Sequence, residues 1–480
     1  MSTERESLEK QRTDLHESLG LIDERIAHYV SPTDVPLQLL RDQKSLKQQL
    51  AAIEQRLQAT PAAAAHVPPA TTTTQTITNT ATSHGAQGVF NAPVTFNIGS
   101  PAPEPPAPAP PASPAPARPD VGASLAELLA EAEAERARHE AQYRQTLQEA
   151  EGYIQQGGRT GPLARLGAAR LDQLEQRLRA GLVAILNDPE QLLPTPQRVR
   201  AGFLLGRLGD PRYPVTPAQW QAELARRNEH FGQPAGYFCY VRGETYTIGT
   251  VAGDAPDNQK PAHRVTVQPF WIARSTITNQ QWQAWVQQGG KPSYLTDASD
   301  VNGPNQPVVR VTWYMGRDFC AWLTQQLAAH LPPDYIIRLP TEAEWEIAAA
   351  YDAAMHRRHY PWGDRWADDY AATAENRESK GTRWAAPVGC FACGAAACGA
   401  LDMAGNVWEW SASPYTDNYA QPASHTAPND ANSFTLRGSS FSENSTHALC
   451  GARGWSFPDY IDDYNNDDGV RVVCALRLGG

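Results

Sequence analysis

The sequence lacks several features that would assign it to a class at once. No apolar run approaches the roughly 18 residues that a membrane-spanning helix needs, so we expect no membrane span. Residues 1–10 alternate in charge and lack the apolar stretch of a secretory signal, which favours a cytoplasmic protein with reduced thiols. Basic residues are also too few, because 41 Lys and Arg face 52 Asp and Glu and give a net charge of −11. This balance argues against nucleic acid as a partner.

Cysteine and tryptophan are missing from the first 219 residues, although the chain holds seven Cys and 13 Trp. At 480 residues the chain is too long for one core, so this shift in composition marks domain boundaries. Residues 59–120 are rich in Pro, Ala and Thr and predict a largely disordered linker. Within it, residues 86–98 place apolar side chains at alternate positions, a short strand pattern with no partner strand visible.

The N-terminal residues 1–58 carry two apolar stripes at helical spacing, separated by the turn residues 31–36. They predict a helical hairpin of coiled-coil type. So short a hairpin has little core of its own, so its apolar seam is expected to contact a second copy of the chain or a partner helix. A hairpin closed on itself, or packed on its own chain, is the alternative.

Residues 121–230 follow the linker and predict a helical adaptor. Its helices are expected at 123–155, 163–186 and 195–208, where charged and apolar residues alternate with helical spacing. The last helix ends before a Gly-Asp-Pro turn.

The remaining residues, 231–480, contain most of the aromatic residues and many Gly, Asn and Asp turn residues. Helices are expected at 277–287 and 313–327, and strands at 246–249 and 263–267. The pattern indicates an α+β domain with much irregular structure.

Seven short motifs in this part resemble one family. The resemblance is to the formylglycine-generating-enzyme (sulfatase-modifying factor) family, and it implies a variant of the C-type lectin fold. It covers about half of the chain. The motifs are Thr276–Gln280, Pro307–Trp313, Arg338–Glu346, Tyr360–Gly363, Leu401–Trp410, Leu436–Phe441 and Gly469–Val473.

Two motifs carry side chains with their own physical interpretation. Thr341 and Glu344 have the spacing of a capping box, which argues against a catalytic role for these groups. Asn406 and Glu409 are hard oxygen donors three residues apart, and with backbone carbonyls such as that of Val407 they suit calcium. The resemblance implies such a calcium site, and side chains that only satisfy a tight turn are the alternative.

The cysteines bear on whether the chain is an enzyme. The resemblance implies that enzymes of the family bind copper(I) through two cysteines after a Gly-Gly-Ser-aromatic segment, yet residues 438–449 contain none. We therefore expect no copper and no enzymatic activity. The resemblance also makes Cys320 and Cys450 structural neighbours, reduced or bridged. Cys390, Cys393 and Cys398 could hold zinc with a fourth ligand, or be simply buried thiols.

The segment from about 437 to 473 points to recognition. It mixes isolated aromatic residues with Asn, Asp and Ser, the composition of antibody loops and binding hot spots. Its flanks match family framework, and many of its residue types arise from asparagine codons altered at adenines. This pattern resembles the variable proteins of diversity-generating retroelements; an ordinary polar loop is the alternative. The expected contact residues are Ser442, Asn444, Trp455, Phe457, Tyr460, Ile461, Asp463, Tyr464, Asn466 and Asp468.

The sequence therefore predicts a non-catalytic bacterial protein whose C-terminal hypervariable surface binds a protein or another macromolecule. Self-association through the hairpin would multiply a weak affinity at each site. Two alternatives stay open: a copper- or iron-dependent oxidoreductase of the formylglycine type, and a scaffold subunit of a bacterial defence or signalling system.

Overall fold

A computed structural model describes two compact units of the chain, Met1–Ala112 and Ser113–Gly480. In the second unit it describes residues 125–250, 256–294, 302–377, 379, 381–420, 433–460 and 467–478. In the first unit it describes seven residues, all helical: Arg12, His16, Leu19, Lys47, Leu50, Glu54 and Leu57.

The seven helical residues of the first unit fall inside the two stretches where helices are expected. Leu57 is buried, and Leu19 and Leu50 are half-buried. The hairpin itself stays a prediction. The expected linker at 59–120, with the strand pattern at 86–98, lies outside the described residues.

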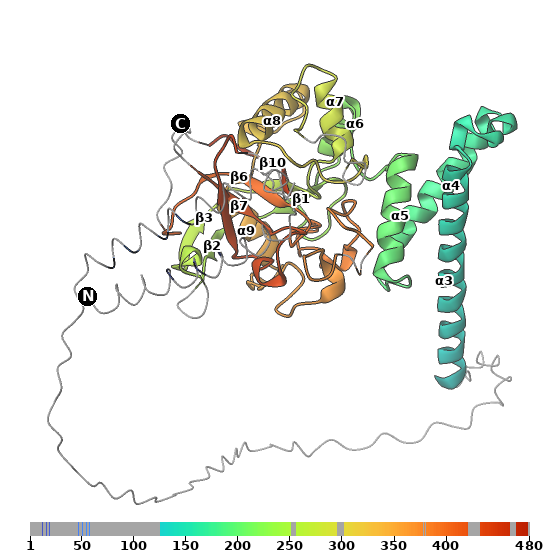
Figure 1. The fold of residues 1–480 in the computed structure, drawn as a ribbon, viewed down its shortest axis with the longest axis horizontal. Helices are drawn as coiled ribbons and strands as arrows, with labels where there is room; N and C mark the ends of the chain where they lie inside the picture. Colours follow the sequence, from blue (N-terminus) through green and yellow to red (C-terminus); the bar gives the residue numbers. More distant parts are fainter. Residues whose placement is uncertain are drawn as a thin grey trace, which may run out of the picture. The chain divides into compact units, whose positions relative to one another are not determined.

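The second unit begins with the expected helices, which are grouped together in Figure 1. The predicted helix at 195–208 is confirmed with the same bounds, whereas the one expected from 163 begins at Ala168. Gly167 has φ of 82°, so the chain forms a 3₁₀ segment before it and cannot continue as one α-helix. The elements that precede the first strand are α3 (Leu125–Gln155), η2 (Gly158–Thr160), η3 (Pro162–Leu166), α4 (Ala168–Leu186), α5 (Thr195–Leu208) and α6 (Pro217–Ala225).

Helix α5 packs closely against the segments that follow it because two of its positions are glycine. A Cβ added at Gly202 would lie 2.5 Å from the sulfur of Cys390, and one at Gly206 would lie 2.2 Å from Oδ1 of Asn305. Leu204, Leu205 and other residues of α3 to α5 share one hydrophobic cluster with Phe391. The helical adaptor is therefore joined to the C-terminal domain by a common core.

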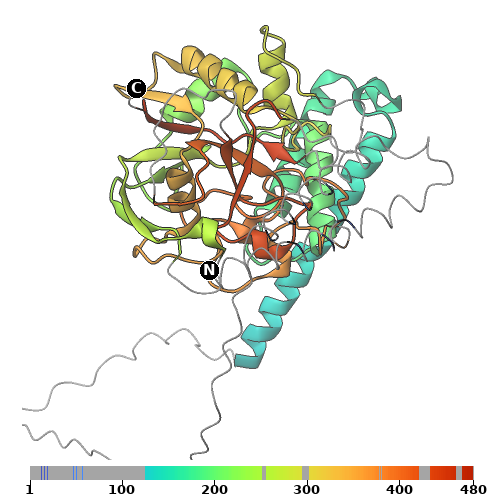
Figure 2. The ribbon, with the colours of Figure 1, turned by 60° about the vertical axis from the view of Figure 1, so that its left-hand side comes forward.

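The C-terminal domain contains an antiparallel four-stranded sheet whose middle is formed by the end of the chain. Its order is β1-β4-β10-β5, so the last strand lies between two much earlier ones. Figure 2 shows the orange to red strands of the last part of the chain in the middle of this domain. The strands are β1 (Phe238–Val241), β4 (Phe270–Ala273), β5 (Tyr335–Arg338) and β10 (Val473–Leu476).

Two further sheets occur among the described residues. A two-stranded hairpin pairs β2 (Thr245–Ile248) with β3 (His263–Thr266), close to the two strands that the sequence predicts. The other sheet has the order β8-β7-β6-β9, with β9 parallel to β6. Its strands are β6 (Trp408–Pro414), β7 (Phe434–Arg437), β8 (Arg453–Ser456) and β9 (Asp468–Gly469).

Three α-helices and four 3₁₀ segments complete the described part of the domain. The helix expected at 313–327 is confirmed, and so is the capping box of Thr341 with Glu344. No helix among the described residues is long and apolar enough to span a bilayer. The elements are η4 (Asp257–Gln259), α7 (Asn279–Val286), α8 (Trp313–Leu327), α9 (Glu342–Ala350), η5 (Asp368–Tyr370), η6 (Ala392–Gly394) and η7 (Ser445–His447). Helices and short strands in this arrangement confirm the α+β class.

Candidate functional site

Three large aromatic side chains are exposed within six residues at the edge of the β8-β7-β6-β9 sheet. Trp455 is 51% exposed, Phe457 45% and Tyr460 47%, although aromatic side chains are normally largely buried. The ring centroids of Trp455 and Phe457 are 5.7 Å apart, and Tyr415 lies 5.9 Å from Trp455. We call Tyr415, Trp455, Phe457 and Tyr460 the aromatic surface.

The backbone that carries the aromatic surface is held from below. Arg453 begins β8 and is buried, with Nε 2.8 Å from a carboxylate oxygen of Glu342. Its guanidinium also lies over the rings of Tyr415 and Tyr419, 4.9 and 4.2 Å from their centroids. The backbone N–H of Trp313 donates to the carbonyl of Pro458 at 3.0 Å. These contacts fix the strand and the following turn, so the aromatic rings are displayed from a rigid base.

Two of the polar residues expected in the binding surface make contacts that organise their own loop. The hydroxyls of Ser440 and Ser442 both donate to Oδ2 of Asp467, a buried carboxylate, with 2.6 Å for Ser440. Asn444 is the N-cap of η7, where its side chain accepts from the N–H of Thr446. Ser442 thus joins its loop to the segment that precedes β9.

Of the other expected contact residues, one is described by the structure and four are not. Asp468 lies on β9 opposite Trp408 and is half-buried. Ile461, Asp463, Tyr464 and Asn466 lie outside the described residues. The structure therefore brings Trp455, Phe457 and Tyr460 together. Ser442 bonds to Asp467, and Asp468 is the next residue in the chain.

The Asn406–Glu409 motif, expected to bind calcium, has its oxygens occupied by protein groups. Nη2 and Nε of Arg471 lie 2.6 and 2.8 Å from the two carboxylate oxygens of Glu409, which is fully buried. The amide oxygen of Asn406 accepts from the N–H of Ala386 at 2.8 Å, and Val407 is buried in a hydrophobic cluster. Because a guanidinium already neutralises the carboxylate, these donors do not fit a calcium ion.

The glutamates of helix α9 are also buried and paired. Glu346 lies 2.8 Å from Arg437 and 2.7 Å from Arg357, and the hydroxyl of Tyr419 donates to it at 2.7 Å. Burial alone would raise the pKa of Glu346, but the two arginines outweigh it and hold that pKa below its ordinary value. Glu344 is paired in the same way with Arg338.

Glu342 differs from these two glutamates in its electrostatics. Burial raises its pKa, and Arg453 opposes that shift without cancelling it. Sequence reasoning identified the capping role of Glu344 but missed all these ion pairs. The signal was present in two cases: Glu346 and Glu409, each in one motif, pair with Arg437 and Arg471 of two other motifs.

The structure does not bring Cys320 and Cys450 together, which corrects the expected pairing. Both thiols are free. Cys320 packs in the cluster around α8, whereas Cys450 packs in a second cluster with Trp345 and Tyr351. Burial raises the pKa of Cys450 to about 12, so its thiol is protonated at neutral pH.

The three cysteines around η6 face different surroundings. Cys390 is buried beside Gly202 of α5, and burial raises its pKa to about 12. The thiol of Cys398 donates to the carbonyl of Ala348 at 3.3 Å, while Cys393 is half-buried. Across the described part of the chain, no three His, Cys, Asp or Glu side chains are arranged to hold a metal ion.

Comparison with known proteins shows which family this domain belongs to. The family description "Sulfatase-modifying factor enzyme 1-like domain" matches residues 211–476. Hercynine oxygenase of Mycolicibacterium thermoresistibile is 35% identical over 218 residues, which are 38% of this chain and 45% of that protein. Formylglycine-generating enzyme of Thermomonospora curvata is 26% identical over 259 residues, 41% of this chain and 78% of that protein. The chain thus spans less than half of the length of the hercynine oxygenase relative.

Among solved structures, Treponema denticola variable protein 1 superposes with a TM-score of 0.40 and 22% identity, over 50% of this chain and 94% of that one.

The named relatives correct one expectation. The expectation that the chain is not an enzyme is corrected, because relatives that match it in sequence are named hercynine oxygenase and formylglycine-generating enzyme. The absence of cysteine from residues 438–449 is therefore not sufficient evidence that the chain lacks enzymatic activity.

Proposed function

Because this chain belongs to the sulfatase-modifying factor enzyme 1-like family, we propose that its C-type lectin-like frame displays the aromatic surface to a macromolecular ligand. The observation that carries this proposal is the exposure of Trp455, Phe457 and Tyr460 within six residues. Clustered aromatic side chains on a rigid base supply large contact area at low cost in side-chain entropy. A protein ligand fits this chemistry best.

The contrast between the loop and its flanks supports the proposal. Arg437, Ser439 and Ser440 before the loop are fully buried, and so are Val470 to Val473 after it. Between them, Trp455, Phe457 and Tyr460 are exposed and can change without disturbing the core, whereas Phe441, Ala448 and Cys450 are themselves buried. We propose that residues from about 437 to 473 are the variable region, which a retroelement diversifies at its exposed positions. A template repeat beside the gene that differs from this segment only at adenines, next to a reverse transcriptase, would test this origin.

A ligand screen with alanine variants tests the binding role. The full chain would be screened on a protein array, and dissociation constants of the hits measured by biolayer interferometry. We expect Trp455→Ala to weaken binding at least about 30-fold, the size of a hot-spot truncation. Tyr294→Ala is the matched control, because Tyr294 is 54% exposed and lies outside the aromatic surface. Equal effects of the two variants would contradict the proposal.

A second candidate is oxidoreductase activity, which the 35% identity to a hercynine oxygenase favours. Copper(I) does not fit the described thiols. Those of Cys390 and Cys450 are buried, with pKa values raised to about 12, and the described residues contain no metal-binding cluster. Oxygen consumption would be measured with hercynine or a cysteine-containing peptide, with copper(I) or iron(II) added. Turnover that persists in Trp455→Ala would place this activity away from the aromatic surface.

We also propose that the N-terminal residues 1–58 associate with a second copy or a partner helix. The support is the helical state of all seven described residues there. Sedimentation equilibrium of the full chain against a Leu50→Glu variant tests it, since a charge on the apolar seam should lower the mass to that of a monomer. An unchanged mass would count against association through this seam.

A further inference from the structure

Among the described residues, the β3 edge of the hairpin β2–β3 has no partner strand, and a groove lies beside it. Val267 donates its N–H to the carbonyl of Glu244 at 3.1 Å, and the register pairs Thr245 with Thr266. Hydrogen-bonded pairs alternate along an antiparallel ladder, so the Thr245–Thr266 and Thr247–Arg264 pairs turn their N–H and C=O groups outward. Thr247 confirms this geometry, because its outward N–H and C=O both bond to the hydroxyl of Tyr351.

On β3 the outward groups belong to Arg264 and Thr266. In the described part of the structure, no hydrogen bond reaches the backbone N–H or C=O of either residue. Unpaired strand edges of this kind are templates for an additional strand. The edge is short, so an added segment would pair over a few residues.

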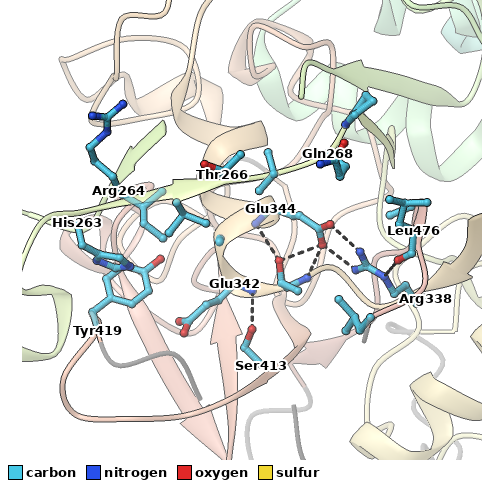
Figure 3. A pocket seen from close by; sticks show the side chains of 18 of the residues that line it. His263, Arg264, Thr266, Gln268, Arg338, Glu342, Glu344, Ser413, Tyr419 and Leu476 are labelled. Atoms are coloured by element: carbon cyan, nitrogen blue, oxygen red, sulfur yellow. Dashed lines mark hydrogen bonds and ion pairs between the residues drawn. The ribbon is translucent and has the colours of Figure 1, made fainter. Parts of the chain in front are cut away.

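The groove beside this edge has a volume of about 560 Å³, within the range of ligand sites. Consecutive residues from His263 to Pro269 line one side, as expected when a cavity runs along the edge of a strand. Figure 3 shows the N-terminus of α9 across from β3, with Glu342 and Glu344 beside it. Val265, Ala343 and Leu476 supply apolar floor between the polar groups.

The charges that remain unpaired in this groove are positive. Glu344 is neutralised by Arg338, and Glu342 by Arg453. Arg264 and Arg477 also line the groove, are exposed, and have no ion-pair partner among the described residues. The chain as a whole has a net charge of −11, so a groove with two free arginines is selective for acidic ligands.

We propose that the β3 edge binds an extended, acidic peptide segment of another protein, which adds as a third strand to the β2–β3 sheet. Backbone groups of Arg264 and Thr266 hold the main chain, and the guanidiniums of Arg264 and Arg477 pair with its carboxylates. This mode gives affinity through the main chain and selectivity through alternate side chains. The site is separate from the aromatic surface.

Fluorescence anisotropy with the full chain tests the proposal. The probe is a labelled peptide of alternating Val and Glu, and its control is the same peptide with Lys in place of Glu. We expect the Glu peptide to bind, the Lys peptide to bind at least tenfold more weakly, and the affinity of the Glu peptide to fall as salt is raised. Equal binding of both peptides, or no binding of the Glu peptide, overturns the proposal.

Two proline variants test strand addition itself. Thr266→Pro removes one outward N–H of β3 and leaves the β2–β3 ladder intact, so it should weaken the Glu peptide about tenfold. Thr245→Pro is the matched control: it makes the same change on the opposite edge and also breaks the 2.8 Å bond between the two threonine hydroxyls. We expect it to bind as the wild type does, and equal effects of the two prolines overturn strand addition.

A charge variant covers the case in which the prolines unfold the hairpin. Arg264→Glu combined with Arg477→Glu changes exposed side chains only, so circular dichroism should match that of the wild type. We expect it to weaken the Glu peptide at least tenfold and to strengthen the Lys peptide. Unchanged affinity for both peptides overturns the proposed site.

Discussion

The buried core of the C-terminal domain, which we call the frame, and the aromatic surface differ in which side chains they bury and which they expose. The frame encloses charge: Glu346, Glu409, Arg437 and Arg471 are all fully buried and joined in ion pairs. The surface instead exposes apolar rings at Trp455, Phe457 and Tyr460. Buried ion pairs tolerate little change, because removing one partner leaves an uncompensated charge. Exposed rings contribute little to the core, so stability and the proposed recognition are carried by different residues.

The largest expected effect comes from breaking a buried ion pair of the frame. Glu409→Gln leaves the guanidinium of Arg471 buried without a countercharge, and we expect it to lower the free energy of unfolding by about 3–5 kcal/mol. Urea denaturation measures it. Glu140→Gln is the control, because its partner Arg144 is exposed, and it should cost less than about 0.5 kcal/mol.

A smaller loss is expected where α5 packs on the domain. Gly206→Ala brings a methyl group to 2.2 Å from Oδ1 of the buried Asn305, and we expect it to cost about 1–3 kcal/mol in urea denaturation. Gly152→Ala in α3 meets no atom within 4 Å and should instead stabilise by about 0.5–1 kcal/mol. Losses of equal size in both variants would show that close packing is not the reason for glycine at position 206.

A pH-dependent effect is expected at Asp402. Burial raises its pKa to about 6, against an ordinary value of 3.8, and its Oδ1 has no hydrogen-bond partner in the part of the chain that the structure describes. A raised carboxyl pKa contributes stability that is present below pH 4 and lost as the pH rises through 6.

Asp402→Asn tests this effect because the variant has no charge there, while its amide oxygen can still accept from the N–H of Gly389. We expect wild type to gain about 1–2 kcal/mol relative to the variant between pH 7 and pH 4. Stability curves for both proteins from urea denaturation at several pH values give the difference. A difference independent of pH would contradict the raised pKa.

The smallest effect on stability should come from the aromatic surface. Trp455→Ala removes a ring that is 51% exposed, and we expect the free energy of unfolding to change by less than about 1 kcal/mol. Trp410→Ala is the contrasting variant, since Trp410 is fully buried and its loss should cost about 3–5 kcal/mol. Similar losses in both would remove the distinction between frame and surface.

Much of the fold could be predicted from local patterns. The helix at 313–327 and the capping box at Thr341 follow from residues within one or two turns, where spacing is decisive. Strand partners are set by contacts between distant residues, so the position of β10 between β4 and β5 has no local signal. The expectation that Cys320 and Cys450 are neighbours came from the family resemblance, and the structure places them in different clusters.

The site was predictable only in part. Exposed aromatic residues in a polar segment were a usable signal for Trp455, Phe457 and Tyr460. Tyr415 was missed because it joins the surface from the end of β6, 40 residues earlier in the chain. Arg471 as the partner of Glu409 was also missed, because oxygen donors that suit a cation can equally accept from an arginine, and the sequence does not say which distant residue is opposite.

The position of β10 has a consequence for how the protein is made. β10 lies between β4 and β5 and is made after both, so these two strands cannot be joined until β10 has been synthesised. A frameshift or stop codon introduced into residues 437–473 would delete that strand along with Arg471, the counterion of Glu409. A chain without β10 and Arg471 has an incomplete sheet and a buried carboxylate without its counterion, so we expect the domain not to fold.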